Sequence, residues 1–334
     1  MKVAINGFGR IGKLVFRAFL EKKLSNVEVV AINELGTLES NIHLMQFDSV
    51  HGKLPFNIKK HKNKIKYKNK FVNFYSEKDP KNLPWKKLNI DVVLECSGVF
   101  TSKEKAMSHI YAGAKKIIIS APGKDVDATI VKGVNDNILS KKHNIISNGS
   151  CTTNCLAPIA MILDKELGIE NGFMTTIHSY TGDQRTVDQN HIDMRRARAA
   201  AISMIPTSTG AAKALSLVLP KLKGKLDGTA IRVPTPNVSL IDLTFVSRKK
   251  TSVEKINNLI LKASKTAKLK NILTTNSLPL VSIDFNHNAS SSVFDLTQTQ
   301  VLNSKFCRIL SWYDNEWGFS NRMIETMMDL KKFI

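Results

Sequence analysis

The first 150 residues alternate between short apolar strands and helices. Residues 2–6 form a strand, residues 10–22 carry apolar side chains at helical spacing, and residues 27–33 form a second strand. Further buried-strand patterns and one helical stretch follow at residues 91–98, 102–112, 115–123 and 143–150. This alternation predicts an α/β unit with a Rossmann-type, doubly wound parallel sheet and helices on both faces.

From about Ser150 the pattern changes to a helix at residues 152–167 and then to longer strands. These strands are predicted at residues 172–180, 228–236, 237–247, 279–285, 291–295 and 305–314. An amphipathic helix closes the chain from about Ser320 to Lys332. We therefore predict a cofactor-binding domain at residues 1–149, completed by a C-terminal helix within 316–334, and an α+β catalytic domain with a largely antiparallel sheet at residues 150–315.

Length and composition agree with two globular domains. The chain has 334 residues, of which 43% are hydrophobic, and no apolar run approaches the roughly 18 residues that span a bilayer. The N-terminus enters a glycine-rich loop before a signal-peptide core could form, so we expect a cytoplasmic protein. The four cysteines at positions 96, 151, 155 and 307 lack paired zinc spacing. We expect them to be reduced thiols, with no metal site.

The formal net charge of +21 permits three interpretations. They are nucleic-acid binding, attraction of anionic small molecules, and lysines dispersed over solvated surface. The densest basic tract, residues 59–70, alternates polar and apolar positions as an exposed hairpin strand does. Nucleic acid is therefore not expected to be the main partner, although a second role in nucleic-acid or surface binding stays open.

A glycine motif follows the first strand and opens the first helix. Gly7, Gly9 and Gly12 fit G-x-G-x-x-G, in which they serve the tight turn, the close approach of pyrophosphate, and helix-strand packing. Glu34 ends the next strand at about the distance expected for an acidic residue that accepts from ribose hydroxyls. The carboxylate repels a 2′-phosphate, so the pattern predicts an NAD site rather than an NADP site.

Cys151 has the local means to act as a nucleophile. It follows Ser150, a good N-cap, at a predicted helix start, where the partial positive charge of the helix stabilises a thiolate. Cys155 lies one turn deeper and is interpreted as a buried apolar residue. His178 ends a strand and is the candidate base, although the sequence alone does not pair it with Cys151 in space.

The segment SNGSCTTNCLAP at residues 147–158 resembles the active-site signature of glyceraldehyde-3-phosphate dehydrogenases, with Gly149 in place of the usual Ala. The resemblance extends over essentially the whole chain. It includes, in family order, INGFGRIG, FDSVHGK, HSYTGDQRTVD, RRARAAA, PTSTGAAKA, GTAIRVPTPNVSLIDLT and SWYDNEWG. It implies an NAD-dependent, phosphorylating enzyme of glycolysis and gluconeogenesis, which converts glyceraldehyde 3-phosphate and inorganic phosphate to 1,3-bisphosphoglycerate through a Cys151 thioester, with His178 as the base.

The resemblance also implies the ligand contacts. The substrate phosphate falls to Thr181 and Arg232, with Asp183 nearby, and the attacking phosphate falls to Ser150, Thr152, Arg196, Thr209 and Gly210. Neighbouring Arg195 and Arg198 are interpreted as a solvated or interface cluster. The cofactor positions are Arg10 and Ile11 at the pyrophosphate, Glu34 at the adenosine ribose, Lys78 and Ser120 along the adenosine, and Asn315 at the nicotinamide carboxamide.

Several positions depart from the family pattern. Glu34, Lys78, Ser120 and Phe319 stand where Asp, Arg, Thr and Tyr are usual, and none of these changes removes a catalytic function. Gln189 and Asn190 replace the Leu-Pro of strictly NAD-specific bacterial relatives, which leaves some NADP use open.

The segment 180–202 resembles the S-shaped loop that lines a neighbouring subunit's cofactor groove, so a homotetramer is implied. The alternative enzyme is an erythrose-4-phosphate dehydrogenase, which hydrolyses its thioester.

Overall fold

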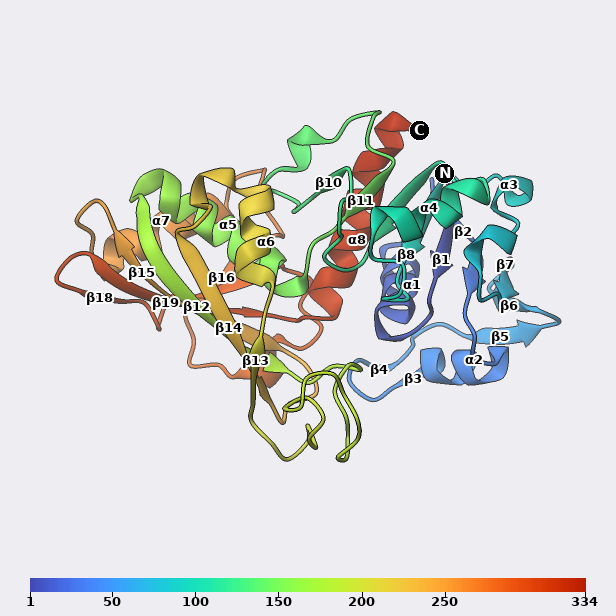
Figure 1. Cartoon of the computed structure of the whole chain (residues 1–334), viewed down its shortest axis with the longest axis horizontal. Helices are drawn as coiled ribbons and strands as arrows, with labels where there is room; N and C mark the ends of the chain where they lie inside the picture. The colour runs from blue at the N-terminus through green and yellow to red at the C-terminus, as the bar shows by residue number, and fades with distance from the viewer. The chain divides into compact units, whose positions relative to one another are not determined.

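The computed structural model describes all residues from Met1 to Ile334, and the chain divides into two compact units (Figure 1). Unit 1 comprises Met1–Ile130, Asp136–Gly149 and Ser320–Ile334, whereas unit 2 comprises Val131–Asn135 and Ser150–Phe319. Each unit contains its own sheet and its own buried cluster of apolar side chains. No helix combines the length and the apolar character that a membrane crossing requires.

Unit 1 is built on a nine-stranded sheet in the order β10-β11-β9-β8-β1-β2-β7-β6-β5. All pairs from β10 to β7 are parallel, which confirms the predicted Rossmann-type sheet. The strands are β1 (Lys2–Asn6), β2 (Glu28–Asn33), β5 (Ile58–His61), β6 (Lys64–Tyr67), β7 (Lys70–Tyr75), β8 (Val92–Glu95), β9 (Lys116–Ile119), β10 (Ala128–Thr129) and β11 (Ile145–Ser147). Strands β3 (Phe47–Asp48) and β4 (Gly52–Lys53) form a separate pair.

The helices of unit 1 connect these strands. They are α1 (Arg10–Lys22), α2 (Leu38–Gln46), α3 (Trp85–Leu88) and α4 (Lys103–Tyr111), with 3-10 turns η1 (Pro80–Asn82), η2 (Asp136–Ile138) and η5 (Lys331–Phe333). Thr37 and Ser102 begin α2 and α4, because each side chain accepts a backbone N–H three residues later. Lys23 ends α1 in the left-handed conformation, with φ of 49°.

The basic tract at residues 59–70 lies in an antiparallel meander of β5, β6 and β7, as its alternation predicted. Ile65 and Tyr67 point into the core, whereas the lysines of the tract are exposed. The turns that join the three strands place Lys62 and Lys68 at positive φ. The charge of this tract is therefore spread over a solvated face whose opposite side is apolar.

Unit 2 contains an eight-stranded sheet in the order β13-β14-β12-β15-β19-β17-β16, with β18 beside β19. Two pairs, β12 with β14 and β16 with β17, are parallel, and the other pairs are antiparallel, so the sheet is largely antiparallel as predicted. The strands are β12 (Ile169–Ser179), β13 (Ile205–Ser208), β14 (Leu226–Val233), β15 (Ser239–Ser247), β16 (Leu273–Asn276), β17 (Ser292–Asp295), β18 (Gln300–Leu302) and β19 (Phe306–Tyr313).

The helices of unit 2 pack their apolar faces on this sheet. They are α5 (Cys151–Glu166), α6 (Ala211–Val218) and α7 (Val253–Ser264), with 3-10 turns η3 (Pro220–Leu222) and η4 (Ser282–Phe285). Ser150 begins α5 and Ser252 begins α7 by accepting a backbone N–H with the side chain. Helix α5 is buried from Thr152 to Ala160, so its N-terminal half is packed on all sides.

Two predicted elements need correction. The strand predicted at residues 279–285 is wrong, because Val281 donates its N–H to the Asp284 carboxylate at 2.8 Å and the chain turns into η4. The last helix, α8 (Trp317–Leu330), begins before the predicted Ser320. Its start is set by Asp314, whose carboxylate accepts the N–H of Trp317 at 2.7 Å.

Candidate active site

Cys151 and His178 lie next to each other in unit 2. Cys151 is the first residue of α5, and Ser150 caps this helix by accepting the N–H of Thr153 at 3.1 Å. His178 is the penultimate residue of β12 and is 4% exposed. The Cys151 Sγ lies 3.5 Å from His178 Nε2. The fold therefore brings a partly exposed thiol and a buried imidazole within proton-transfer reach.

Arg232 joins the pair through strand register. Parallel pairing of β12 with β14 places Arg232 directly beside His178. Arg232 Nη1 lies 2.7 Å from His178 Nδ1 and donates to the Ser179 carbonyl at 2.9 Å, and Nδ1 lies 2.7 Å from the same carbonyl. If Nδ1 carries the proton, it donates to this carbonyl and Nε2 is left as an acceptor toward the sulfur. In the other tautomer, Nε2 donates to the sulfur.

The electrostatics keep the imidazole neutral. Burial first, and then the Arg232 charge, lower the pKa of His178 to about 3. In the tautomer with the proton on Nδ1, the Nε2 lone pair faces the Cys151 sulfur and can accept a proton. The lowered pKa also makes this imidazole a weaker base, so the role of His178 as proton acceptor remains a prediction.

The Cys151 thiol differs from the sequence expectation. We expected the helix N-terminus to favour the thiolate, but burial raises the pKa of Cys151 above its ordinary value. Arg232, the Thr152 hydroxyl and the N–H groups of Cys151 and Thr152 act in the opposite direction without reversing the shift. Cys151 therefore has to give its proton to a base before it can attack a substrate. His178 is the candidate base that contacts its sulfur.

The other cysteine of α5 has no such base. Cys155 is fully buried, and its sulfur contacts Ser292 Oγ at 3.4 Å. Burial raises the pKa of Cys155 to about 12. The prediction that Cys155 is an inert, buried residue is in accord with this placement.

Tyr313 packs against His178 and contacts Thr152, the residue after Cys151. Its hydroxyl contacts Thr152 Oγ1 at 2.8 Å and Thr176 Oγ1 at 2.9 Å, and its ring packs edge-on against His178. Thr152 is 4% exposed. The Thr152 hydroxyl faces Tyr313 and the Cys151 sulfur, and the role of Thr152 at the attacking phosphate remains a prediction.

Arg196 is fixed beside the site by three acceptors. It donates to Asp183 Oδ2 at 2.7 Å, to Thr207 Oγ1 at 2.9 Å and to the Ser208 carbonyl at 3.2 Å. Burial lowers the pKa of Arg232, and the charge of Arg196 acts in the same direction, so the two guanidinium groups share one electrostatic environment. Two cations near a buried imidazole favour an anionic ligand.

The remaining predicted anion contacts lie at turns and helix starts. Thr181 begins a turn closed by its carbonyl and the N–H of Gln184. Gly210 is the N-cap of α6, and Thr209 accepts the N–H of Ala211 at 3.2 Å. Arg198 forms an exposed ion pair with Asp188, and Arg195 is exposed, as expected for a solvated cluster.

Asn315 is held with a defined orientation. Its side-chain oxygen accepts from Ser179 Oγ and Ser239 Oγ, each at 2.9 Å. The residue is 5% exposed, so this amide is fixed inside unit 2. An amide anchored by its oxygen presents its NH₂ group in one direction, which suits recognition of another amide.

A pocket of about 440 Å³ lies at the glycine motif of unit 1. The predicted residues Gly7, Gly9, Glu34 and Lys78 line it, together with Asn6, Asn33, Leu35, Glu77, Cys96, Ser97, Val99 and Phe100. Arg10 and Ile11 are not among the lining residues. The Arg10 side chain binds Asp48 at 2.8 Å, so these two residues can contribute only at the N-terminus of α1.

The three glycines of the motif differ in the space that surrounds them. Gly7 has φ of 85°, and a Cβ there would lie 2.4 Å from Ser97 Cα. A Cβ on Gly12 would lie 2.1 Å from the Gly7 carbonyl oxygen, whereas a Cβ on Gly9 would meet nothing within 4 Å. The open side at Gly9 is the space that a pyrophosphate needs, so the loop fits a dinucleotide.

Glu34 is turned into the loop. Its carboxylate accepts from the N–H of Phe8 at 2.6 Å and from the N–H of Leu35 at 2.8 Å. Each oxygen retains acceptor capacity for a ribose hydroxyl. Ser120, at the end of β9, interacts with the Cys96 thiol, which itself lines the pocket.

A buried polar network behind this pocket was not predicted. Trp85 Nε1 donates to His109 Nδ1 at 3.0 Å, His109 Nε2 contacts Glu95 Oε2 at 2.9 Å, and Asn6 donates to the same oxygen at 2.6 Å. Ser97 donates its N–H to the other Glu95 oxygen at 2.8 Å. Asn6 and Ser97 line the pocket, so the network fixes its wall. The available signal was a Glu inside the apolar strand DVVLECSG.

The chain matches two domain models of one enzyme family, which together cover most of its length. Residues 1–103 match the glyceraldehyde 3-phosphate dehydrogenase NAD binding domain, and residues 150–315 match the C-terminal domain of the same enzyme. A glyceraldehyde-3-phosphate dehydrogenase from Xanthobacter flavus is 56% identical over 332 residues, covering 99% of each chain. Enzymes of the same name from Zymomonas mobilis and Geobacillus stearothermophilus are each 52% identical, covering 99% and 97% of this chain and 99% and 96% of their own lengths.

Proposed function

The chain belongs to the glyceraldehyde-3-phosphate dehydrogenase family and is an NAD-dependent glycolytic oxidoreductase, and we propose that Cys151 is its nucleophile and His178 its base. The observation that carries the assignment is the 3.5 Å separation of Cys151 Sγ and His178 Nε2 at the start of α5. Residues 1–149 with the C-terminal helix serve as the cofactor domain, and residues 150–315 as the catalytic domain.

The reaction begins with the thiol. Cys151 attacks the aldehyde carbon while His178 Nε2 takes the sulfur proton, so a carbon–sulfur bond forms and a hemithioacetal results. The protonated His178 and the Cys151 N–H then donate to the oxygen on that carbon. When bound, NAD would accept the hydride from that carbon while the proton of its oxygen stays on His178, which would leave a thioester on Cys151.

Inorganic phosphate completes the cycle. One phosphate oxygen attacks the thioester carbon, the Cys151 sulfur leaves, and the acyl phosphate departs. Arg232, beside His178, and Thr181 bind the substrate phosphate in this proposal. Arg196 and the helix starts at Ser150, Thr209 and Gly210 bind the attacking phosphate, because guanidinium, hydroxyl and N–H groups suit phosphate oxygens. In this proposal the whole reaction can also run in reverse, so the enzyme serves gluconeogenesis as well as glycolysis.

Glu34 and Lys78 bind the adenosine side of NAD in this proposal, with Gly7, Gly9 and Gly12 forming the loop. Arg10 and Ile11 contribute backbone N–H groups to the pyrophosphate, Ser120 contacts the adenosine side, and Asn315 holds the carboxamide. The pocket geometry at Gly9 and the remaining acceptor capacity of Glu34 support this arrangement.

A homotetramer in the cytoplasm is also proposed. Several large apolar side chains are exposed in the segment between residues 187 and 204. Their exposed fractions are 72% for Val187, 100% for Ile192, 86% for Met194, 83% for Ile202 and 76% for Met204. Such a concentration is typical of a surface covered by another subunit. A cytoplasmic location suits a thiol nucleophile, which must stay reduced.

The proposal is tested by following NADH formation from glyceraldehyde 3-phosphate with and without inorganic phosphate. We expect turnover to require phosphate and Cys151→Ser to lower it by at least about 10³-fold. Cys155→Ala, one turn deeper in α5, is the matched control and should keep activity within about threefold. Phosphate-independent turnover would instead indicate thioester hydrolysis, and an active Cys151→Ser enzyme would refute the nucleophile assignment.

A further inference from the structure

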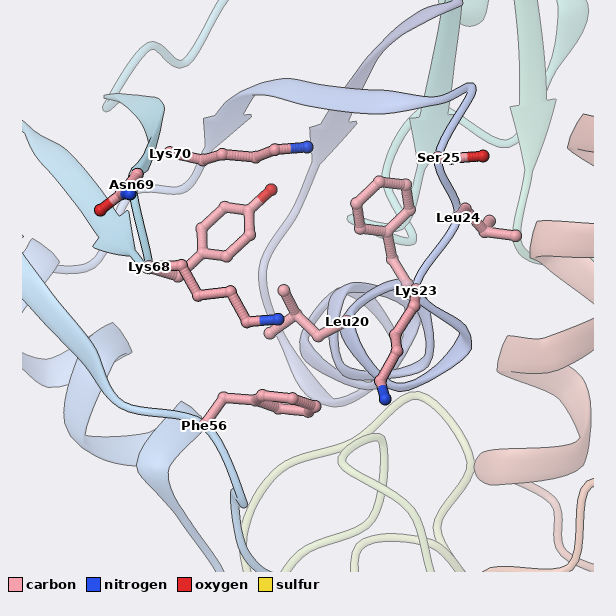
Figure 2. A pocket seen from close by; sticks show the side chains of 10 residues that line it. Leu20, Lys23, Leu24, Ser25, Phe56, Lys68, Asn69 and Lys70 are labelled. Carbon is pink, nitrogen blue, oxygen red and sulfur yellow. The ribbon is translucent and has the colours of Figure 1, made fainter.

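A second pocket in unit 1 has no part in the proposed reaction. It has a volume of about 410 Å³ and is bounded by the end of α1, by Phe56 and by the β6–β7 turn (Figure 2). A 13-residue helix rising about 1.5 Å per residue spans about 20 Å, so the end of α1 lies far from the glycine loop at its start. The two pockets share no lining residue.

The inner wall of this pocket is aromatic and aliphatic. Phe19 is 5% exposed, Leu20 is 7% exposed and Tyr67 is 6% exposed, and the Phe56 ring forms another side. Figure 2 shows Leu20 and Phe56 directed at the same hollow from separate segments. Flat apolar walls of this kind accept a planar ring by stacking.

The rim is strongly basic. Lys23, Lys68 and Lys70 line the pocket from α1, from the turn and from β7, and all three are exposed. The Lys68 ammonium lies 5.7 Å from the centroid of the Phe56 ring, so a cation sits directly above an aromatic wall. The lining contains three lysines and no acidic residue.

The Tyr67 hydroxyl supplies a polar group at the pocket. The structure gives it no hydrogen-bond partner within the protein, and burial of the ring and the charge of Glu28 raise its pKa. The phenol therefore stays protonated and can donate to a ligand.

We propose that this pocket binds a nucleoside diphosphate, with the base against the aromatic wall and the phosphates at the three lysines. The hollow lies within the usual range of about 300–1,000 Å³ for ligand pockets. A diphosphate carries about three negative charges at neutral pH, which matches the rim. A nucleoside alone would use only the aromatic wall, and a diphosphate alone would use only the basic rim.

The test uses the full chain with NAD present to fill the glycine-loop pocket. Guanosine diphosphate binding is measured by equilibrium dialysis, and its position is read from protection of Lys68 and Lys70 against acetylation, by mass spectrometry. We expect protection of both lysines. Guanosine alone and inorganic pyrophosphate alone should bind at least about tenfold more weakly, because each loses one half of the contacts.

Variants separate this site from general attraction of anions. Lys68→Ala with Lys70→Ala should weaken binding by about tenfold, and Tyr67→Phe, which removes only the hydroxyl, by about fivefold. Lys62→Ala with Lys64→Ala removes the same charge from the same meander outside the pocket and should change binding less than about twofold. All four substituted lysines are exposed, so folding is expected to be retained.

Three results would overturn the proposal. They are no protection of Lys68 and Lys70, equal losses in the two lysine double variants, and pyrophosphate binding as tight as that of guanosine diphosphate. The last two would indicate attraction of any polyanion to the +21 surface. Dehydrogenase activity of these variants is a separate measurement, so failure here leaves the catalytic assignment intact.

Discussion

His109 in unit 1 and His178 in unit 2 are both almost completely buried, yet their neighbours differ in charge. His109 accepts from Trp85 with Nδ1 and faces the Glu95 carboxylate with Nε2, so both ring nitrogens are occupied. His178 has Arg232 and a carbonyl at Nδ1 and a thiol at Nε2. Burial alone therefore does not make a histidine a catalytic base. A ring nitrogen that can accept a proton must also face a nucleophile.

The charged partners of the two imidazoles are opposite in sign. His109 Nε2 faces the Glu95 carboxylate, whereas His178 Nδ1 lies beside the Arg232 guanidinium. Glu95 also accepts from Asn6 and from the Ser97 N–H, so this network is satisfied within the protein. The same residue type thus positions a pocket wall in one unit and, in our proposal, acts as the base in the other.

The largest expected effect comes from His178→Asn. The variant retains a polar side chain but loses the proton acceptor, so kcat should fall by about 10³-fold. Steady-state NADH formation measures the loss, and circular dichroism checks that the fold is retained. A kcat within tenfold of the wild type would mean that another group takes the Cys151 proton.

A smaller effect is expected from Arg232→Gln. Removing the cation should raise the pKa of His178 from about 3, although burial keeps it below its ordinary value. The acidic limb of the pH profile for Cys151 alkylation should therefore move to higher pH. The kcat/KM for glyceraldehyde 3-phosphate should also fall by about 10²-fold, because a phosphate ligand is lost.

The control for this variant is Arg198→Gln, which removes an equal charge from an exposed ion pair. It should leave both the alkylation profile and kcat/KM nearly unchanged. An acidic limb that stays in place in Arg232→Gln would show that the guanidinium does not influence the imidazole.

The smallest catalytic effect is expected from His109→Phe. The substitution leaves Trp85 Nε1 without its acceptor and removes one donor from Glu95, at a cost of about 2 kcal/mol in the free energy of unfolding. Thermal or urea unfolding measures this loss. The kcat of the folded enzyme should stay within about threefold of the wild type. A drop as large as that expected for His178→Asn would mean that His109 also contributes to catalysis.

The sequence predicted the parts of the molecule that depend on local chemistry. Apolar runs identified the parallel strands, and the spacing of Gly7, Gly9 and Gly12 predicted a loop whose steric demands the structure reproduces. Ser150 was recognised as an N-cap because its side chain bonds within the same turn. These features need only neighbouring residues.

What the sequence did not predict depends on pairing across the fold. Arg232 reaches His178 through the register of β12 with β14, which no local pattern encodes. The direction of the Cys151 pKa shift follows from burial by surrounding elements, which outweighs the helix N-terminus. Glu34 is turned toward Phe8, 26 residues earlier in the chain. In each case a tertiary contact decides the chemistry of a residue whose type was already recognised.

The uneven environments of the four thiols allow active sites to be counted. Burial raises the pKa of Cys96 and of Cys155 to about 12, and it also raises that of the buried Cys307. Only Cys151 has an imidazole at hand to remove its proton. Because we propose Cys151 as the nucleophile, we expect an iodoacetamide titration to reach complete inactivation at one label per chain, and the label consumed then gives the concentration of competent enzyme in any preparation.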